Sequence, residues 1–324
     1  MTTISIDNDC SLYYEDTGIP DIEDNYTTYI CIHGYAHDLR TFNPFVQHAP
    51  KSVRLIRFNG RSYNGSSELP TQIRSLYETR GISRSDSVAL TEVCSADLAK
   101  FILAISKKCN LSKKSINLLA HSQGCSWVVG VIGDHIDRDQ PLYDDALSYV
   151  SQFTLVDPPA SSWDLTMPKG YTGFNPFGEL KFEDYAGGHW LHEYGENGLI
   201  LKSTPTFSSN LSQTNYYDPK IVQRIPPSLF HIDPVHATKV VARALRGESG
   251  HSDITGSLVG CGNTLQECEF CCSWISTITK GGPRDWNVLW INNANHFVIS
   301  NQPQAFWKYL GALETKLDRV EPKL

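Results

Sequence analysis

The chain has 324 residues, with 28 Lys and Arg against 35 Asp and Glu and a formal net charge of -7. Its 40% hydrophobic residues can fill a large core, which excludes a disordered chain, and no apolar run is long enough for a transmembrane helix. A pI near 5.9, without a block of Lys or Arg, argues against a nucleic-acid surface. We therefore expect neither nucleic acid nor membrane as a partner, and one large domain or two smaller ones.

The start of the chain and its cysteines bear on the cellular compartment. The segment MTTISIDNDC has no basic stretch followed by an apolar one, as a secretory signal would. Nine cysteines are an odd number for a complete set of disulfides. Both features predict a cytoplasmic protein with reduced thiols.

Short apolar runs bounded by turn residues alternate with longer helical patterns. Residues 4–6 and 11–18 predict an N-terminal hairpin around Asn8-Asp9. Further runs are apolar almost throughout, which is typical of buried parallel strands. They cover 27–34, 53–60, 115–122, 152–159 and 287–294.

Two long helical patterns accompany these runs. Residues 86–109 place apolar side chains at helical spacing and end near Lys107 and Lys108, whose charges suit a helix C-terminus. Residues 304–320 predict a closing helix. Strands that alternate with helices predict an α/β fold with a mostly parallel sheet.

The stretch 160–284 interrupts this alternation. Its first part, 160–230, is rich in aromatic residues and in Gly, Pro, Ser and Asn, without a repeat. We expect an inserted cap of short helices and loops on a single core formed by 1–159 and 285–324. Within the stretch, residues 254–263 are a candidate for a degenerate strand of that core.

The strongest local motif is Ala120-His121-Ser122-Gln123-Gly124, which follows an apolar run. A serine on a sharp strand-to-helix turn has a strained backbone, and small neighbours let strand and helix pass closely. The turn exposes the Ser122 hydroxyl as a nucleophile. It also directs the backbone N–H of Gln123, near a helix N-terminus, to where an oxyanion would form.

Two other segments can complete such a site. His33-Gly34 ends an earlier strand, so the next residue, Tyr35, can supply a second oxyanion N–H. His296 lies in a loop after the last strand and can act as general base to Ser122.

These motifs together resemble the α/β-hydrolase family. The matching segments are Ile32-His33-Gly34, the turn NGRSYNGSS at 59–67, the serine turn at 120–124 and Asn295-His296-Phe297. They lie between residues 27 and 310 and cover nearly the whole chain except the insert. In the turn, Asn59 replaces the usual Asp, and Ser62 and Asn64 replace the usual Gly. The resemblance implies a mostly parallel, twisted sheet flanked by helices, with an inserted cap.

The acid of the triad has several candidates. The resemblance places it after the penultimate strand or, less often, after the strand that follows the serine helix. Asp157 ends the run 152–159 and is favoured, because catalytic groups collect at the carboxyl ends of parallel strands. Its role would be to orient the imidazole of His296. Asp233, Asp253 and Glu267 remain alternatives.

Weaker signals concern the pocket and possible metals. Residues expected to line a substrate pocket are His33, His121, Trp163, Tyr185, His189 and Trp190. His189-Trp190-Leu191-His192-Glu193 lacks the H-E-x-x-H order of a zinc protease. The cluster Cys261, Cys268, Cys271 and Cys272 has no second C-x-x-C pair, so we expect buried thiols. The sequence predicts neither metal nor cofactor.

The function expected from these residues is that of a serine hydrolase. It would cleave an ester, lactone or thioester of an apolar or aromatic small molecule through an acyl-enzyme on Ser122. Dehalogenases and epoxide hydrolases of this fold are disfavoured, because they use Asp at the position of Ser122. A lyase, a cyclase or a ligand-binding receptor on the same pocket remains an alternative.

Overall fold

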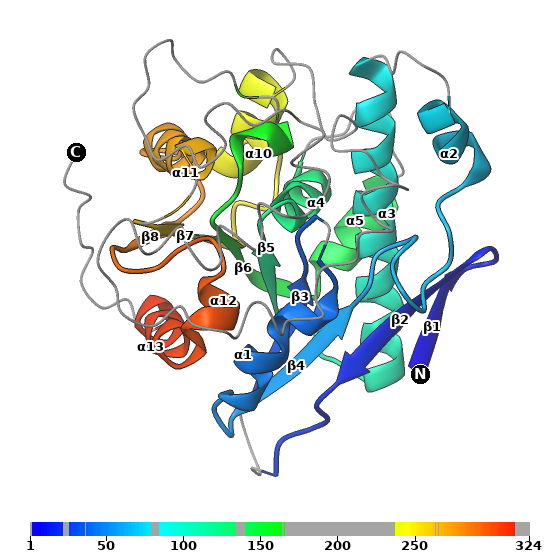
Figure 1. The fold of residues 1–324 in the computed structure, drawn as a ribbon, viewed down its shortest axis with the longest axis horizontal. Coiled ribbons are helices and arrows are strands. Elements are labelled where there is room, and N and C mark those ends of the chain that lie inside the picture. Colours follow the sequence, from blue (N-terminus) through cyan, green and yellow to red (C-terminus); the bar gives the residue numbers. More distant parts are fainter. Residues whose placement is uncertain are drawn as a thin grey trace.

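One eight-stranded sheet organises the part of the chain that this computed structural model describes, which is 2–21, 26–35, 37–78, 84–133, 140–163, 165, 237–262, 264 and 266–314. The strands are β1 (Thr2–Asp7), β2 (Cys10–Asp16), β3 (Thr27–Ile32), β4 (Val53–Phe58), β5 (Ile116–His121), β6 (Val150–Val156), β7 (Thr255–Cys261) and β8 (Trp286–Ile291). Their order across the sheet is β1-β2-β4-β3-β5-β6-β7-β8 (Figure 1). The predicted α/β fold class is confirmed.

The strand directions follow the predicted pattern. β1 and β2 form an antiparallel hairpin, and β2 is also antiparallel to β4. All other neighbours, from β4 and β3 to β7 and β8, are parallel. The carboxyl ends of β5, β6 and β8 therefore share one edge of the sheet, where open α/β sheets bind their ligands.

Helices flank the sheet on both faces (Figure 1). The helices described are α1 (Asn43–Gln47), α2 (Thr71–Glu78), α3 (Arg84–Cys109), α4 (Gly124–Ile132), α5 (Gln140–Leu147), α10 (Ala242–Arg246), α11 (Gln266–Ile278), α12 (Val298–Asn301) and α13 (Pro303–Glu314). Short 3-10 turns span Leu39–Phe42 and Ala160–Trp163, and a π-helical turn spans Ala237–Val241. None of the described helices has the length and apolar character that crossing a membrane requires.

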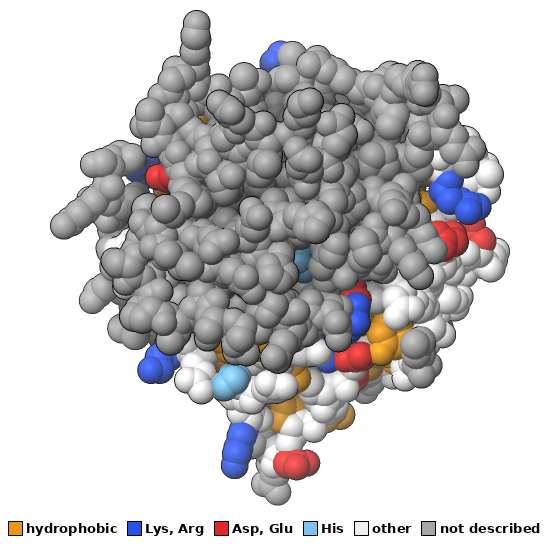
Figure 2. All heavy atoms as spheres, viewed as in Figure 1, with side chains coloured by type: hydrophobic (Ala, Val, Ile, Leu, Met, Phe, Trp, Pro, Cys, Tyr) orange, Lys and Arg blue, Asp and Glu red, His pale blue; other side chains and the backbone are white. Residues whose placement is uncertain are grey.

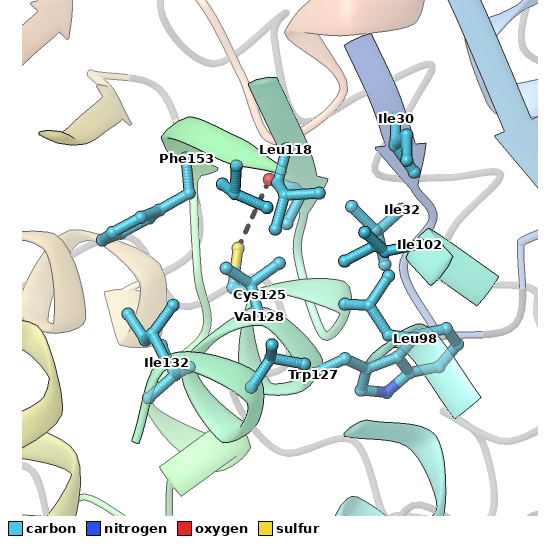
Figure 3. Packing of buried hydrophobic residues seen from close by; sticks show 14 of the residues in the cluster. Ile30, Ile32, Leu98, Ile102, Leu118, Cys125, Trp127, Val128, Ile132 and Phe153 are labelled. Atoms are coloured by element: carbon cyan, nitrogen blue, oxygen red, sulfur yellow. Dashed lines mark hydrogen bonds between the residues drawn. The ribbon is translucent and has the colours of Figure 1, made fainter. Parts of the chain in front are cut away.

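The parallel strands bury both of their faces, in two separate cores. Along β3, Ile30 and Ile32 join the core beneath α3, α4, α5 and α11, whereas Tyr29 and Cys31 join the core beneath α1, α12 and α13. This alternation follows from the two-residue period of a strand. Figure 3 shows the first core around α4, with side chains of β3, α3 and β6 packed against it. Because both faces of these strands are buried, their sequences are apolar almost throughout and do not alternate with polar residues.

The expected insert at 160–284 is only partly described. Residues 166–236, which hold most of its aromatic side chains, lie outside the described residues. Later in the range, β7 pairs with β6 and β8, and α11 contributes Cys271, Cys272 and Ile275 to the first core. The candidate strand at 254–263 is therefore a strand of the main sheet. Where the described surface is visible in Figure 2, Lys and Arg side chains lie beside Asp and Glu.

Candidate active site

Ser122 sits on a sharp turn between β5 and α4. Its φ is 55°, in the left-handed region, which costs a residue other than glycine roughly 1–2 kcal/mol. Two backbone hydrogen bonds hold it there. Its N–H donates to Val156 O at 3.0 Å, and its carbonyl accepts from Cys125 N at 3.0 Å. The predicted strained serine turn is thus present, anchored to the neighbouring strand β6.

Small residues are needed around this turn because the loop after β3 passes directly against it. A Cβ on Gly124 would lie 2.5 Å from the carbonyl oxygen of His33. A Cβ on Gly34 would lie 2.8 Å from Ser122 Cβ and 3.3 Å from its Oγ. These approaches place the His33-Gly34 segment beside the serine hydroxyl.

His296 approaches the same hydroxyl from the loop between β8 and α12. Its Nε2 is 2.9 Å from Ser122 Oγ, and its Nδ1 is 2.7 Å from Asp157 Oδ2. With Nδ1–H donating to the carboxylate, Nε2 is left to accept the serine proton. Three residues from three strand ends thus form one hydrogen-bonded chain.

Asp157 follows β6 and is completely buried. Its backbone also has a left-handed φ of 49°, and its N–H donates to Val259 O at 2.8 Å. Besides His296, the carboxylate accepts from Cys261 N at 3.2 Å and from the hydroxyl of Thr264. Such donors stabilise the charged form of a buried carboxylate.

The other candidate acids lie elsewhere or are not described. Asp253 pairs with Lys114 at 2.5 Å on the surface, and this ammonium lowers the pKa of the Asp253 carboxyl. Asp233 lies outside the described residues, and Glu267 is half-buried in the first turn of α11. Of the candidate acids that the structure describes, Asp157 is the one it places against His296.

The two residues expected to form the oxyanion hole flank the serine. Gln123 follows Ser122 at the N-terminal end of α4, where the helix dipole favours negative charge. Its side-chain Oε1 accepts from Ser162 Oγ at 2.7 Å. Tyr35 follows Gly34, the residue packed against Ser122. Their assignment as oxyanion donors stays a prediction.

Two of the histidines expected to line the pocket are buried near Ser122, His33 with both ring nitrogens hydrogen-bonded and His121 with Nε2 alone hydrogen-bonded among the described residues. His33 donates from Nδ1 to Gly34 O at 2.8 Å and accepts from Gly60 N at 3.1 Å, which requires the neutral ring. His121 donates from Nε2 to the backbone carbonyl of His296 at 2.7 Å. Burial lowers the pKa of both imidazoles. Trp163 is buried, whereas Tyr185, His189 and Trp190 lie outside the described residues.

Sequence reasoning missed two neighbours of the acid and base. Thr264 donates its hydroxyl to Asp157, and no local motif marks it. Cys268, in the first turns of α11, places its Sγ 3.6 Å from His296 Nδ1. Its C-x-x-C spacing indicated only a buried thiol. All nine cysteines are free.

Comparisons with known proteins agree with this geometry at the level of the fold. No protein-family model matches the sequence, and neither does any curated protein. Among solved structures, an esterase from Exiguobacterium antarcticum aligns at a TM-score of 0.59 and 14% identity, over 97% of this chain and 99% of that one. A bromoperoxidase from Bacillus anthracis aligns at 0.57 and 11%, over 97% and 99% of the two chains. An enol-lactonase from Burkholderia xenovorans aligns at 0.53 and 13%, over 96% and 99%.

Identities this low carry information about the fold rather than about the reaction. The alignments nevertheless extend over almost the whole of each chain. Strand order, serine turn and these likenesses agree with one another, and the protein has the α/β-hydrolase fold.

Proposed function

We propose that the protein is a serine hydrolase that cleaves a carboxylic ester, lactone or thioester. The observation that carries the proposal is the hydrogen-bonded chain from Ser122 Oγ to His296 Nε2 and from His296 Nδ1 to Asp157. A nucleophile, a base and a group that orients the base are the parts that acyl transfer requires. The reaction class is compatible with the fold, which an esterase and an enol-lactonase share.

The steps follow from the contacts. Ser122 Oγ attacks the carbonyl carbon as its proton passes to His296 Nε2, and Asp157 stabilises the resulting imidazolium through Nδ1–H. The backbone N–H groups of Gln123 and Tyr35 would bind the oxyanion, and loss of one such donor costs roughly 10²–10³-fold in kcat. His296 then protonates the leaving alcohol or thiol. A water molecule, deprotonated by the same nitrogen, releases the acid from Ser122.

The proposed substrate is an apolar or aromatic small molecule. This part of the proposal rests on composition, because aromatic residues are concentrated in the stretch of sequence 160–230, which follows Asp157 along the chain. Apolar and aromatic side chains with few polar groups are typical of small-molecule pockets.

The test is covalent labelling by a fluorophosphonate, combined with turnover of aryl esters, lactones and thioesters of graded acyl length. We expect labelling and hydrolysis by the native protein and neither by Ser122→Ala. Ser106→Ala is the matched control, since it removes a buried serine hydroxyl on α3 that has no partner among the described residues. It should label like the native protein.

Four outcomes would contradict the proposal. The first is a native protein that does not react with the probe. The second is undiminished labelling of Ser122→Ala. The third is turnover in H₂¹⁸O without ¹⁸O in the acid product, which would indicate a lyase or cyclase. The fourth is tight, saturable ligand binding without any turnover, which would indicate a receptor instead.

A further inference from the structure

Three different metal-ligating side chains meet on the side of His296 that faces away from Ser122. One ligand atom from each of Asp157, Cys268 and His296 lies within 4.8 Å of the others, and all three residues are buried. Cys268 Sγ is 3.6 Å from His296 Nδ1, and Asp157 Oδ2 is 2.7 Å from the same nitrogen. The thiol takes no part in the proposed hydrolysis.

We propose that Asp157, Cys268 and His296 Nδ1 form an inhibitory binding site for a divalent ion of the Zn²⁺ type. Thiolate, imidazole and carboxylate are the donors that Zn²⁺ binds in proteins. The ion is not a resident cofactor of the reaction. Its inhibitory effect rests on the proposed function, whereas its binding does not.

The distances suit a tetrahedral ion. Bonds of about 2.3 Å to sulfur and about 2.0 Å to nitrogen, at a tetrahedral angle, put the two ligand atoms about 3.5 Å apart. The sulfur and nitrogen are already close to this separation, at 3.6 Å. The nitrogen and the carboxylate oxygen must move apart from 2.7 Å to about 3.3 Å, because the ion replaces the proton between them.

The carboxylate of Asp157 would keep its position when an ion replaces the proton between it and His296. Cys261 N and the Thr264 hydroxyl both donate to Asp157, so its position does not depend on His296 alone. Partners of this kind orient a ligating carboxylate and raise metal affinity. The carboxylate and the thiolate supply two negative charges, which balance those of the ion in a buried place.

Binding would stop hydrolysis by changing the tautomer of His296. The ion takes the lone pair of Nδ1, so the neutral ring must carry its proton on Nε2. Nε2–H cannot accept the proton of Ser122, and the nucleophile loses its base. Cys268 releases its thiol proton to solvent as the S–metal bond forms, so each ion bound releases one proton overall.

The activity test measures inhibition of the full-length protein by Zn²⁺ after increasing incubation times. We expect slow inhibition, because the site is buried, and recovery of the rate with EDTA. Cys268→Ala and Cys268→Ser should each need at least tenfold more Zn²⁺ for half-inhibition, with every variant compared to its own metal-free rate. Cys271→Ala is the matched control, a buried thiol one helical turn further along α11, and should be inhibited like the native protein.

A binding test is independent of catalysis. Cd²⁺ bound to a thiolate gives an ultraviolet charge-transfer band, which we expect in the native protein and in Cys271→Ala but reduced in both Cys268 variants. A Cys268-dependent band in a protein that hydrolyses nothing would support the metal site while the proposed function fails. A band and a half-inhibition concentration that do not change in either Cys268 variant would overturn the metal site, even in a protein that labels at Ser122.

Discussion

The imidazole of His121 donates a hydrogen bond from Nε2 to the backbone carbonyl of His296 at 2.7 Å, and the centroids of the two rings are 4.8 Å apart. His121 is the last residue of β5 and directly precedes Ser122. The segment that carries the nucleophile is therefore also bonded to the loop that carries the base. We infer that His121 is a positioning residue for the distance between Ser122 Oγ and His296 Nε2.

Replacing His121 with Phe should loosen this link. The buried carbonyl of His296 would lose its donor, which costs about 1–3 kcal/mol of stability. We expect kcat to fall while KM changes little, because the His296 loop, rather than substrate contacts, is disturbed. His121→Gln, whose amide N–H can reach the carbonyl, should restore part of kcat. Urea unfolding and steady-state kinetics of both variants check this, and a native kcat in His121→Phe would rule out the positioning role.

Much of the fold could be predicted because its signals are local. Buried parallel strands are apolar along their whole length, and the five long runs each coincide with a strand of the sheet. The serine turn could also be predicted from the sequence. The positive φ of Ser122 and the close approach of the chain at Gly124 require small residues within a segment of five residues, which makes the motif recognisable.

Contacts that depend on the spatial order of the strands could not be predicted from local sequence patterns. Thr264 reaches Asp157 across 107 residues of sequence. Cys268 meets His296 only because α11 packs against β7, the strand that lies between β6 and β8 in the sheet. Neither residue belongs to a motif. Asp157 is favoured over the other candidate acids only because it lies at the end of a predicted strand. Its contact with His296 depends on the tertiary structure, which the sequence motifs do not specify.

Asp157→Asn should lower kcat by roughly 10⁴-fold, the loss typical when an amide replaces the triad carboxylate and favours the wrong imidazole tautomer. The measurement is kcat with an aryl ester, together with circular dichroism to verify folding. Asp253→Asn is the control, and breaking its exposed pair with Lys114 should cost at most about 1 kcal/mol and leave kcat unchanged. A native rate in Asp157→Asn, with loss in Glu267→Gln or Asp233→Asn, would move the acid to that residue.

Gly34→Ala should damage the reaction more than the fold. The new Cβ would be 2.8 Å from Ser122 Cβ, so the serine or the loop must shift. A misplacement of about 1 Å costs up to 10²-fold in rate, and overpacking costs about 1–3 kcal/mol. Gly311→Ala on α13 is the matched control, because the new Cβ would meet none of the described residues within 4 Å. Replacing a helical glycine with alanine should raise stability by up to about 1 kcal/mol. Equal kinetics for both variants would argue against close packing of the loop on Ser122.

Stability should fall as the pH decreases below about 6.5, because buried histidines stay neutral in the folded protein. Burial lowers the pKa of His33 and His121, and it lowers the pKa of His37 from 6.5 to about 4. Between the folded and unfolded pKa values the unfolded chain binds more protons, so the free energy of unfolding rises with pH. The slope for each such group is at most about 1.4 kcal/mol per pH unit.

The measurement is urea unfolding between pH 7 and pH 5 for the native protein, His37→Gln and His48→Gln. His37→Gln removes one group that protonates only on unfolding, so its stability should depend less steeply on pH. His48 is exposed, and its replacement should preserve the native slope. If His37→Gln and the native protein lose stability at the same rate as the pH falls, His37 is not held neutral by the fold, and the depressed pKa is wrong.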